Sequence, residues 1–137
     1  MVAYSFQKRF VAAIRSGAKR QTIRAQRNRP ARHARPGEPL QLFHGMRTRH
    51  CTRIIPDPTC VAILALRLVI SEGCLVDLVV STRCLGPAEF DAFARRDGFS
   101  DASDMAAFWI SQHCPGQSGL IFNGWLIEWL PQGEPMP

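Results

Sequence analysis

The segment from Phe10 to Arg24 limits the possible folds of this chain more than any other part of the sequence. Its first apolar residues, between Phe10 and Ile14, recur at helical spacing, and Gly17 stands where a helix commonly ends in a left-handed residue. The residues that follow, Gln21–Arg24, alternate in the way that is typical of a strand. We therefore expect a short helix that passes directly into a β-strand.

This transition brings three polar side chains, Lys19, Thr22 and Arg24, into one short stretch of chain. An ammonium, a hydroxyl and a guanidinium on one pocket rim would suit a phosphate or a nucleobase. Side chains three positions apart in a regular strand point to opposite faces, so the trio converges only if Lys19 still lies in the turn after Gly17. Taken alone, a solvated turn lysine and a strand threonine explain these residues better.

The remaining apolar pattern predicts five further strands. They are expected at Val2–Phe6, Leu40–His44, Val61–Ile70, Leu75–Val80 and Leu120–Leu130. Ser71-Glu72-Gly73 has the composition of a hairpin turn, so the strands that it joins should form a central antiparallel pair. In the last strand, Trp125, Ile127 and Trp129 share one face at period two, which is typical of a strand that covers the core.

Three helices are expected, and each has recognisable end signals. The first covers Gln7–Ser16, the second begins at Pro87 with Phe90 and Phe93 inward, and the third is capped by Ser100 or Asp101 and stopped by Pro115-Gly116. With 137 residues, 46% of them hydrophobic, we expect one domain over residues 1–131 and a loose tail over residues 132–137.

The cysteine and histidine residues do not form a recognisable ligand or disulfide pattern. Five scattered cysteines argue against a disulfide framework and favour a reducing cytoplasm. The spacings of His44, His50, Cys51 and Cys60 match no familiar zinc site, so we expect no metal and no cofactor. A charged start argues against a signal peptide, and no apolar run approaches the roughly twenty residues that span a membrane.

Positive charge is concentrated in the first half of the chain, and almost all of it is arginine. The formal charge is +6, from 17 Lys and Arg residues against 11 Asp and Glu. Two loops, residues 25–36 and 47–58, carry much of this charge, and we expect the second to lie near the pocket mouth. A nucleic-acid partner would explain the arginines, and so would an arginine bias of the genome or a solvated loop without a specific role.

Four short motifs, taken together and in order, resemble the ASCH domain, a family similar to the PUA domains of RNA-binding proteins. They are G-x-K-x-x-T-I-R from Gly17 to Arg24, Pro36-Gly37-Glu38, Arg96-Asp97-Gly98-Phe99-Ser100 and Phe122-Asn123-Gly124-Trp125. The resemblance implies an α+β fold that is mainly β, a small PUA-like β-barrel with flanking helices.

Some ASCH-like proteins are small amidohydrolases that release cytidine from N4-acetylcytidine with a lysine, a threonine and a glutamate. The resemblance assigns these catalytic roles to Lys19, Thr22 and Asp97, although Asp97 is one methylene shorter than the family's glutamate. A neutral lysine could serve as the base if burial, or cations such as Arg20 and Arg24, lowered its pKa. Thr22 would then be the nucleophile, and Asp97 an acid or a polarising group.

Three further residues complete the predicted pocket. Phe6, Gln21 and Arg24 are expected to bind the substrate, with Arg24 either a ligand anchor or a buried charge partner for Asp97, since a guanidinium does not deprotonate near neutral pH.

Two classes of function remain open, with a modest preference for the hydrolase acting on a modified nucleoside. The alternative is a non-catalytic RNA-binding module, or a ribonuclease, although the four histidines are scattered. Its backbone contacts would come from Arg27, Arg29, Arg32, Arg35, Arg47 and Arg49. Neither class requires a membrane, and we favour a monomer.

Overall fold

Two β-sheets and four helical segments make up the computed structural model, which describes residues 2–135. One sheet has the order β1 (Val2–Phe6), β3 (Leu40–His44), β4 (Thr52–Arg53). The other has the order β2 (Gln21–Arg24), β8 (Leu120–Leu130), β5 (Thr59–Ser71), β6 (Cys74–Val80), β7 (Arg83–Leu85). The helices are the 3-10 segment η1 (Lys8–Phe10), α1 (Val11–Ser16), α2 (Pro87–Arg96) and α3 (Ala102–His113). The fold is therefore mixed α+β and mainly β.

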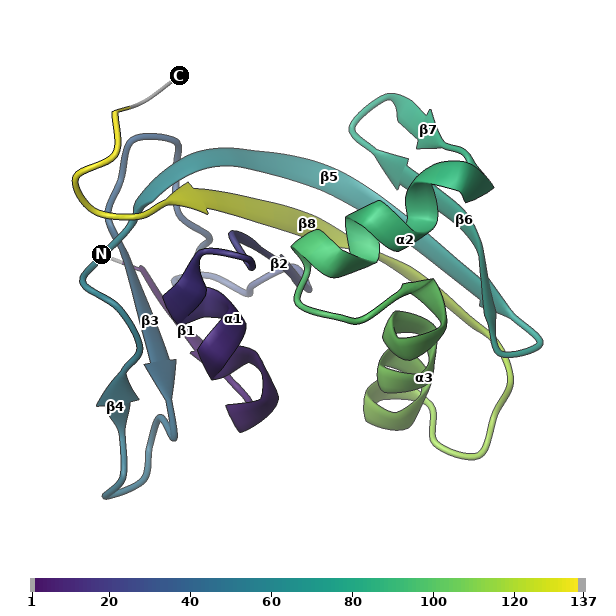
Figure 1. The fold of residues 1–137 in the computed structure, drawn as a ribbon, viewed down its shortest axis with the longest axis horizontal. Helices are drawn as coiled ribbons and strands as arrows, with labels where there is room; N and C mark the ends of the chain where they lie inside the picture. Colours follow the sequence, from purple (N-terminus) through teal and green to yellow (C-terminus); the bar gives the residue numbers. More distant parts are fainter. Residues whose placement is uncertain (1, 136–137) are drawn as a thin grey trace.

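The long strands β5 and β8 connect two halves of the molecule. Figure 1 shows β1, β3, β4 and α1 at one end of this pair, and β6, β7, α2 and α3 at the other. The two sheets meet at one bridge, between Pro39 and Thr59, and Cys60 N–H donates to the Glu38 carbonyl at 2.8 Å beside it. Across residues 2–135 the strand pairs form two open sheets, and no closed barrel is found.

Most predicted elements are confirmed. The four strands β1, β2, β3 and β8 have the predicted bounds, and β5 and β6 extend the predicted ones by one or two residues. Ser71 pairs with Cys74, so the turn contains only Glu72 and Gly73, both at positive φ. In α2, Phe90 and Phe93 are buried as expected. Asp101, not Ser100, caps α3, because its side chain accepts the Asp104 N–H at 2.8 Å.

The structure corrects three of these predictions. The first helix begins at Lys8 as a 3-10 segment and becomes α-helical only at Val11. Strand β5 pairs with β8 along most of its length and with β6 only from Leu66 to Ser71. The central strand of the sheet is therefore β5, and the predicted hairpin of β5 and β6 is not central as a whole. Strand β4 occupies part of the region that was predicted as a second loop, where Ile54 is buried.

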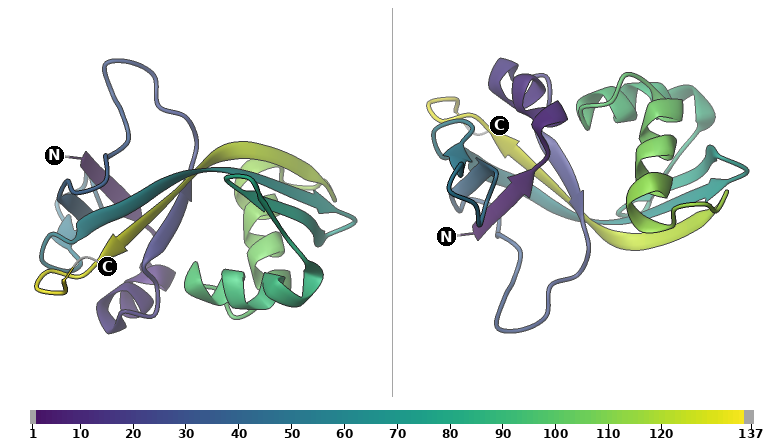
Figure 2. Two further views of the ribbon diagram at one scale, coloured as in Figure 1. Left: turned by 90° about the horizontal axis from the view of Figure 1, so that it is seen from above. Right: turned by 90° about the horizontal axis from the view of Figure 1, so that it is seen from below.

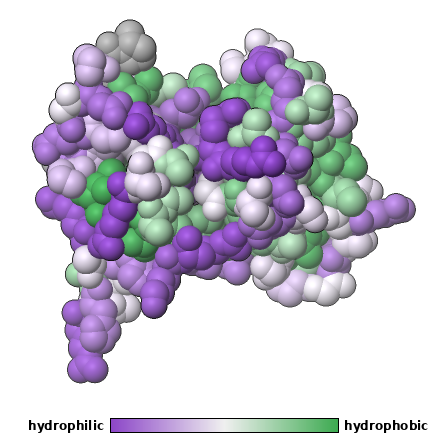
Figure 3. Space-filling model, in the orientation of Figure 1, coloured by the Kyte–Doolittle hydropathy of each residue, from purple (hydrophilic) through white to green (hydrophobic). Residues whose placement is uncertain are grey.

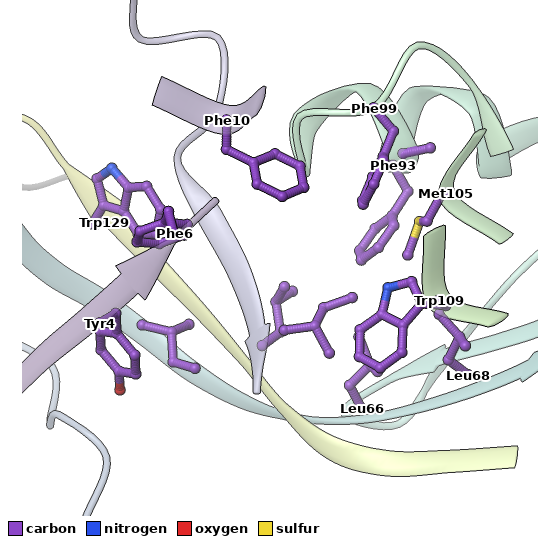
Figure 4. Close-up of a cluster of buried hydrophobic side chains, with 14 of the residues drawn as sticks. Tyr4, Phe6, Phe10, Leu66, Leu68, Phe93, Phe99, Met105, Trp109 and Trp129 are labelled. Carbon is purple, nitrogen blue, oxygen red and sulfur yellow. The ribbon is translucent and has the colours of Figure 1, made fainter. Parts of the chain in front are cut away.

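The buried apolar side chains form one continuous cluster, and β8 contributes to it from both faces. Ile127 and Trp129 are buried on the predicted face, whereas Trp125 is only half-buried. Leu126, on the other face, is also buried. Figure 4 shows the result, with Trp129 near Phe6 at one end and Trp109 beside Leu66 at the other. None of the helices within residues 2–135 is long and apolar enough to span a membrane.

The segment after β8, predicted as a loose tail, makes a specific contact in its first part. Glu134 accepts hydrogen bonds from the Arg20 guanidinium at 2.8 and 3.0 Å. The last two positions of the predicted tail, 136 and 137, and the first residue of the predicted domain lie outside the described residues. The described part of the tail is therefore tied to the turn that follows α1.

Polar contacts hold the first basic loop, residues 25–36, against the body of the protein. Tyr4 Oη lies 2.9 Å from His33 Nδ1, and the Arg27 guanidinium donates to the Ala3 carbonyl at 2.9 Å while lying over the Tyr4 ring. Arg32 donates two hydrogen bonds of 2.8 Å to the Glu38 carboxylate. Figure 2 shows that this loop projects from the side of the molecule opposite α1 and α2.

The Glu38 carboxyl should remain mostly ionised well below pH 4.5, the usual pKa of a glutamate. Its hydrogen bonds from Arg32 and from the Arg35 N–H lower its pKa from 4.5 to about 2. Because the pKa is lower in the folded state, this contact stabilises the loop fully above about pH 4.5 and is lost as the pH falls through about 2. We expect an NMR titration of the Glu38 carboxyl carbon to have its midpoint near pH 2, and Arg32→Ala to move it toward 4.5. Arg29→Ala should leave it unchanged, and a wild-type midpoint near 4.5 would contradict the contact.

Candidate functional site

A cavity of about 300 Å³ lies where the two halves of the molecule meet. Its walls come from the ends of β1 and β2, from η1, from the turn between α2 and α3, from α3 itself and from β8. Figure 4 shows Phe10 and Phe99 pointing toward each other from the two sides, and their ring centroids are 5.4 Å apart. The cavity contains all three residues that the resemblance assigns to catalysis, Lys19, Thr22 and Asp97.

Lys19 reaches the cavity from the turn after α1. Gly17 ends the helix in the left-handed region with φ of 83°, and the Lys19 N–H donates to the Ala13 carbonyl at 3.0 Å. The side chain is directed inward and is only 2% exposed, with Nζ 4.9 Å from the Phe10 ring centroid. Lys19 thus lies in the turn and not in the strand, which is the condition for sharing a pocket with Thr22.

Asp97 ends α2 and is the partner of Lys19. Lys19 Nζ donates to the main-chain oxygen of Asp97 and lies 3.5 Å from Oδ1. Gln21 Nε2 is 3.4 Å from the same Oδ1. The next residue, Gly98, has φ of 95°, and a Cβ placed on it would lie 2.8 Å from Lys19 Cδ. A glycine at this position therefore lets the lysine pass close to the backbone.

Burial moves both members of this pair toward their uncharged forms. Burial lowers the pKa of the Lys19 ammonium. The positive charges of Arg24 and Arg9 lower this pKa further, whereas the Asp97 carboxylate raises it. Burial raises the pKa of the Asp97 carboxyl, against the effect of Lys19 and Gln21. The second cation that lowers the Lys19 pKa, besides Arg24, is Arg9. The sequence predicted Arg20 for this role, but its guanidinium is directed to Glu134.

Thr22 and Arg24 face the cavity from β2, which pairs with β8. Arg24 Nε donates to Thr22 Oγ1 at 3.1 Å, and its other end donates to the Ser5 carbonyl at 2.6 Å. Burial lowers the pKa of Arg24 to about 10, so the guanidinium remains charged at neutral pH. Among the described residues Arg24 forms no ion pair with Asp97, so the geometry favours a role beside the Thr22 hydroxyl.

The other two predicted substrate-binding residues are placed differently. Phe6 lines the cavity, and the Arg24 guanidinium lies 4.8 Å from its ring centroid. Gln21 is buried and does not line the cavity, and its amide is directed to the Asp97 carboxylate. Gln21 is therefore placed to hold the carboxylate.

One wall of the cavity was not predicted from the sequence. Helix α3 contributes Phe108, Trp109, Gln112 and His113. The signal that could have found them is their spacing, because positions i, i+1, i+4 and i+5 share one helix face. Gln112 also accepts a hydrogen bond of 3.0 Å from Gln7 Nε2, which joins η1 to α3 across the cavity.

None of the six arginines predicted to contact nucleic acid lines the cavity. Arg27 and Arg32 are engaged within the chain, as described above. The side chains of the other four form no ion pair with an acid in the part of the chain that the structure describes: Arg29, Arg35, Arg47 and Arg49. Figure 3 shows the turn between β3 and β4, which carries Arg47 and Arg49, as a hydrophilic projection. The second basic segment, residues 47–58, was expected near the mouth, and none of its residues reaches the cavity.

No group of three or more His, Cys, Asp or Glu side chains within residues 2–135 is arranged to hold a metal ion. The chain matches no protein-family model, no curated protein and no solved structure. The chemistry of the cavity and the four sequence motifs therefore carry the functional argument.

Proposed function

We propose that this protein is an ASCH-type amidohydrolase that cleaves the acyl amide of an N4-acylated cytidine, such as N4-acetylcytidine. The observation that carries the proposal is the buried Lys19–Asp97 pair in a cavity that Thr22 also lines. A buried ionisable pair in a cavity is typical of a catalytic site, because burial shifts both pKa values. The bridge between the two sheets at Pro39 and Thr59 supports the accompanying proposal of a PUA-like fold.

The three side chains can divide the steps of amide hydrolysis. Thr22 Oγ1 attacks the acyl carbonyl carbon while neutral Lys19 accepts the hydroxyl proton. The C–N bond then breaks, and the protonated Asp97 carboxyl donates its proton to the departing amine of cytidine. Water attacks the resulting threonine ester and gives one proton to Asp97, and the Lys19 ammonium returns its proton to the Thr22 oxygen. The products are cytidine and the free carboxylic acid.

Arg24 would assist the first of these steps. Its Nε donates to Thr22 Oγ1 at 3.1 Å, so the hydroxyl proton does not point at Arg24 and is available to a base. A nearby positive charge also stabilises the oxygen as it becomes negative. The guanidinium itself transfers no proton.

The test is to incubate the purified protein with N4-acetylcytidine and to follow free cytidine by chromatography. We expect Thr22→Val to lower kcat/KM by about 1000-fold or more, since it removes the nucleophile and keeps the shape of the side chain. Lys19→Met and Asp97→Asn should each lower it by about 100-fold or more.

Thr52→Val is the matched control, because Thr52 is an exposed strand threonine on β4 outside the cavity. It should retain wild-type turnover. Absence of turnover by the folded wild-type protein on N4-acetylcytidine and on larger N4-acyl analogues would overturn the proposal.

A second function is favoured by one observation, the exposed arginines Arg29, Arg35, Arg47 and Arg49 that form no ion pair with an acid among the described residues. They could hold the backbone of a single-stranded RNA. In that case the Kd for RNA should rise steeply with salt, Arg47→Ala combined with Arg49→Ala should weaken binding, and Thr22→Val should have no effect.

A further inference from the structure

The cavity has two ends of different chemistry. All of its charged groups, Lys19, Arg24 and Asp97, lie at the end formed by β2 and the α2–α3 turn. The opposite end is formed by α3 and β8, with the side chains of Trp109, Gln112, His113 and Phe122. Phe108 lies between the two ends, with its ring centroid 5.4 Å from that of Phe10. Aromatic side chains thus make up most of this second end, which the three catalytic roles do not use.

The aromatic rings at this end are arranged around Trp109. The His113 ring stacks on it with centroids 4.5 Å apart at an angle of 17°, and the Phe122 ring lies 4.7 Å away at 50°. Trp109 is buried, whereas Phe122 is half-buried and His113 is exposed. The cavity therefore meets the partly exposed surfaces of Phe122 and His113, supported from behind by Trp109.

Gly124 brings this aromatic end next to the polar one. It lies two positions after Phe122 on the same face of β8, and a Cβ on it would be 2.6 Å from the Phe122 ring and 2.5 Å from the Arg24 main-chain oxygen. Without a side chain at this position, the Phe122 ring can lie along β8 and reach the strand that carries Thr22. Thr22 and Phe122 line the same cavity, so a group attached to a carbonyl at Thr22 can extend through it toward Phe122.

The charges around the aromatic end indicate an uncharged ligand. Within the described residues no Lys, Arg, Asp or Glu from α3 or β8 lines this end of the cavity. Arg9 lies 5.4 Å from the Phe108 ring centroid, but it is paired with Asp104 at 2.7 Å. A phosphate or a carboxylate would find no unpaired cation here, whereas a planar apolar group would pair with the rings.

We propose that the end of the cavity formed by Trp109, His113 and Phe122 is a subsite for an aromatic acyl group. This inference rests on the proposed amidohydrolase function, and it adds that the substrate carries a planar aromatic acyl group in place of acetyl. The cytosine ring occupies the end near Phe6 and Arg24, the scissile carbonyl lies at Thr22, and the acyl ring packs against Phe122 and His113.

The experiment compares kcat/KM for N4-benzoylcytidine and N4-acetylcytidine. We expect wild type to favour the benzoyl substrate by about tenfold, because aromatic pairing and apolar burial both contribute. Phe122→Leu and His113→Ala should each lower the benzoyl-to-acetyl ratio by about three- to tenfold. Phe43→Leu is the control, because Phe43 lies on β3 outside the cavity, and it should keep the wild-type ratio.

Each result separates this inference from the proposed function. Hydrolysis with a preference for acetyl, or a ratio unchanged in Phe122→Leu and His113→Ala, would overturn the subsite and leave the amidohydrolase intact. If neither substrate is hydrolysed, the proposed function fails. Binding of N4-benzoylcytidine then tests whether the aromatic subsite exists. Saturable shifts of the Trp109 indole N–H signal in NMR, absent with cytidine and weakened in Phe122→Leu, would support it, and their absence would overturn it.

Discussion

Asp97→Ala is expected to lower the free energy of unfolding by about 3–5 kcal/mol, because the buried Lys19 amine loses its carboxyl partner and must either stay charged without it or give up its proton on folding. Lys19 is 2% exposed, so water from the cavity replaces the lost partner only in part. Urea denaturation followed by circular dichroism measures the effect. Glu134→Ala is the matched control, since it breaks an exposed ion pair, with Arg20, and should cost less than about 1 kcal/mol.

The double variant Lys19→Met with Asp97→Leu distinguishes a buried charge from simple loss of packing. Replacing both partners by apolar groups of similar size is often neutral, so we expect the double variant to be more stable than Asp97→Ala. A cost remains, of about 1–3 kcal/mol, because the main-chain oxygen of Asp97 loses the hydrogen bond from Lys19. A double variant as unstable as the single one would contradict a charge effect.

The direction in which the stability of Asp97→Ala changes with pH is an independent test of a buried lysine. Burial lowers the pKa of Lys19 in the folded protein, whereas in the unfolded chain it is close to 10.5. Between these two values the unfolded state binds more protons, so the stability of the variant should rise with pH up to about 10.5. Glu134→Ala should lack this rise relative to wild type. A stability of Asp97→Ala that falls in parallel with the control would show that Lys19 is not the destabilising charge.

The strands were predictable where side chains alternate over several residues, as in Val2–Phe6, or where large apolar residues recur at period two, as Trp125, Ile127 and Trp129 do in β8. Such a pattern is fixed by which face meets the core, and the sequence contains it directly. Strands β4 and β7 have only two and three residues, too few to show an alternation. They are strands because β3 and β6 present hydrogen-bonding edges to them, which is a property of the assembled sheet.

The polar end of the cavity was predictable in part, because one short turn carries Lys19 into it. Gly17 indicates where α1 ends, and this places Lys19 in the turn, beside the strand of Thr22. The resemblance supplied Asp97, which lies far away in the sequence. The role expected of Arg20 was wrong because its partner, Glu134, lies in a segment with no strand or helix pattern of its own.

The aromatic end could not be predicted, since its residues look like ordinary core residues. Phe108 and Trp109 have the spacing of a buried helix face, and they would have been assigned to packing. Only the position of α3 across from η1, fixed by contacts such as Gln7 with Gln112, turns that face toward a cavity. Tertiary packing thus decides which apolar side chains line a cavity.

Gly124→Ala is the second change expected to have a large effect. A Cβ at this position would lie 2.5 Å from the Arg24 main-chain oxygen and 2.6 Å from the Phe122 ring, well inside normal contact distances. The Arg24 oxygen belongs to β2, so it can retreat only if β2 parts from β8. We expect a loss of stability near the upper end of about 1–3 kcal/mol, measured by urea denaturation.

The same substitution should also change the cavity, because the Phe122 ring must leave its place over Gly124. We expect the NMR signals of the Trp109 indole and of Phe122 to shift. Gly86→Ala is the control, since nothing lies within 4 Å of a Cβ there and its φ is −84°, which alanine adopts freely. Combining Gly124→Ala with Phe122→Ala should restore only part of the stability, because the clash with the Arg24 oxygen persists. Full recovery would show that the ring alone requires glycine, and Gly124→Ala as stable as Gly86→Ala would contradict the close approach of β2 and β8.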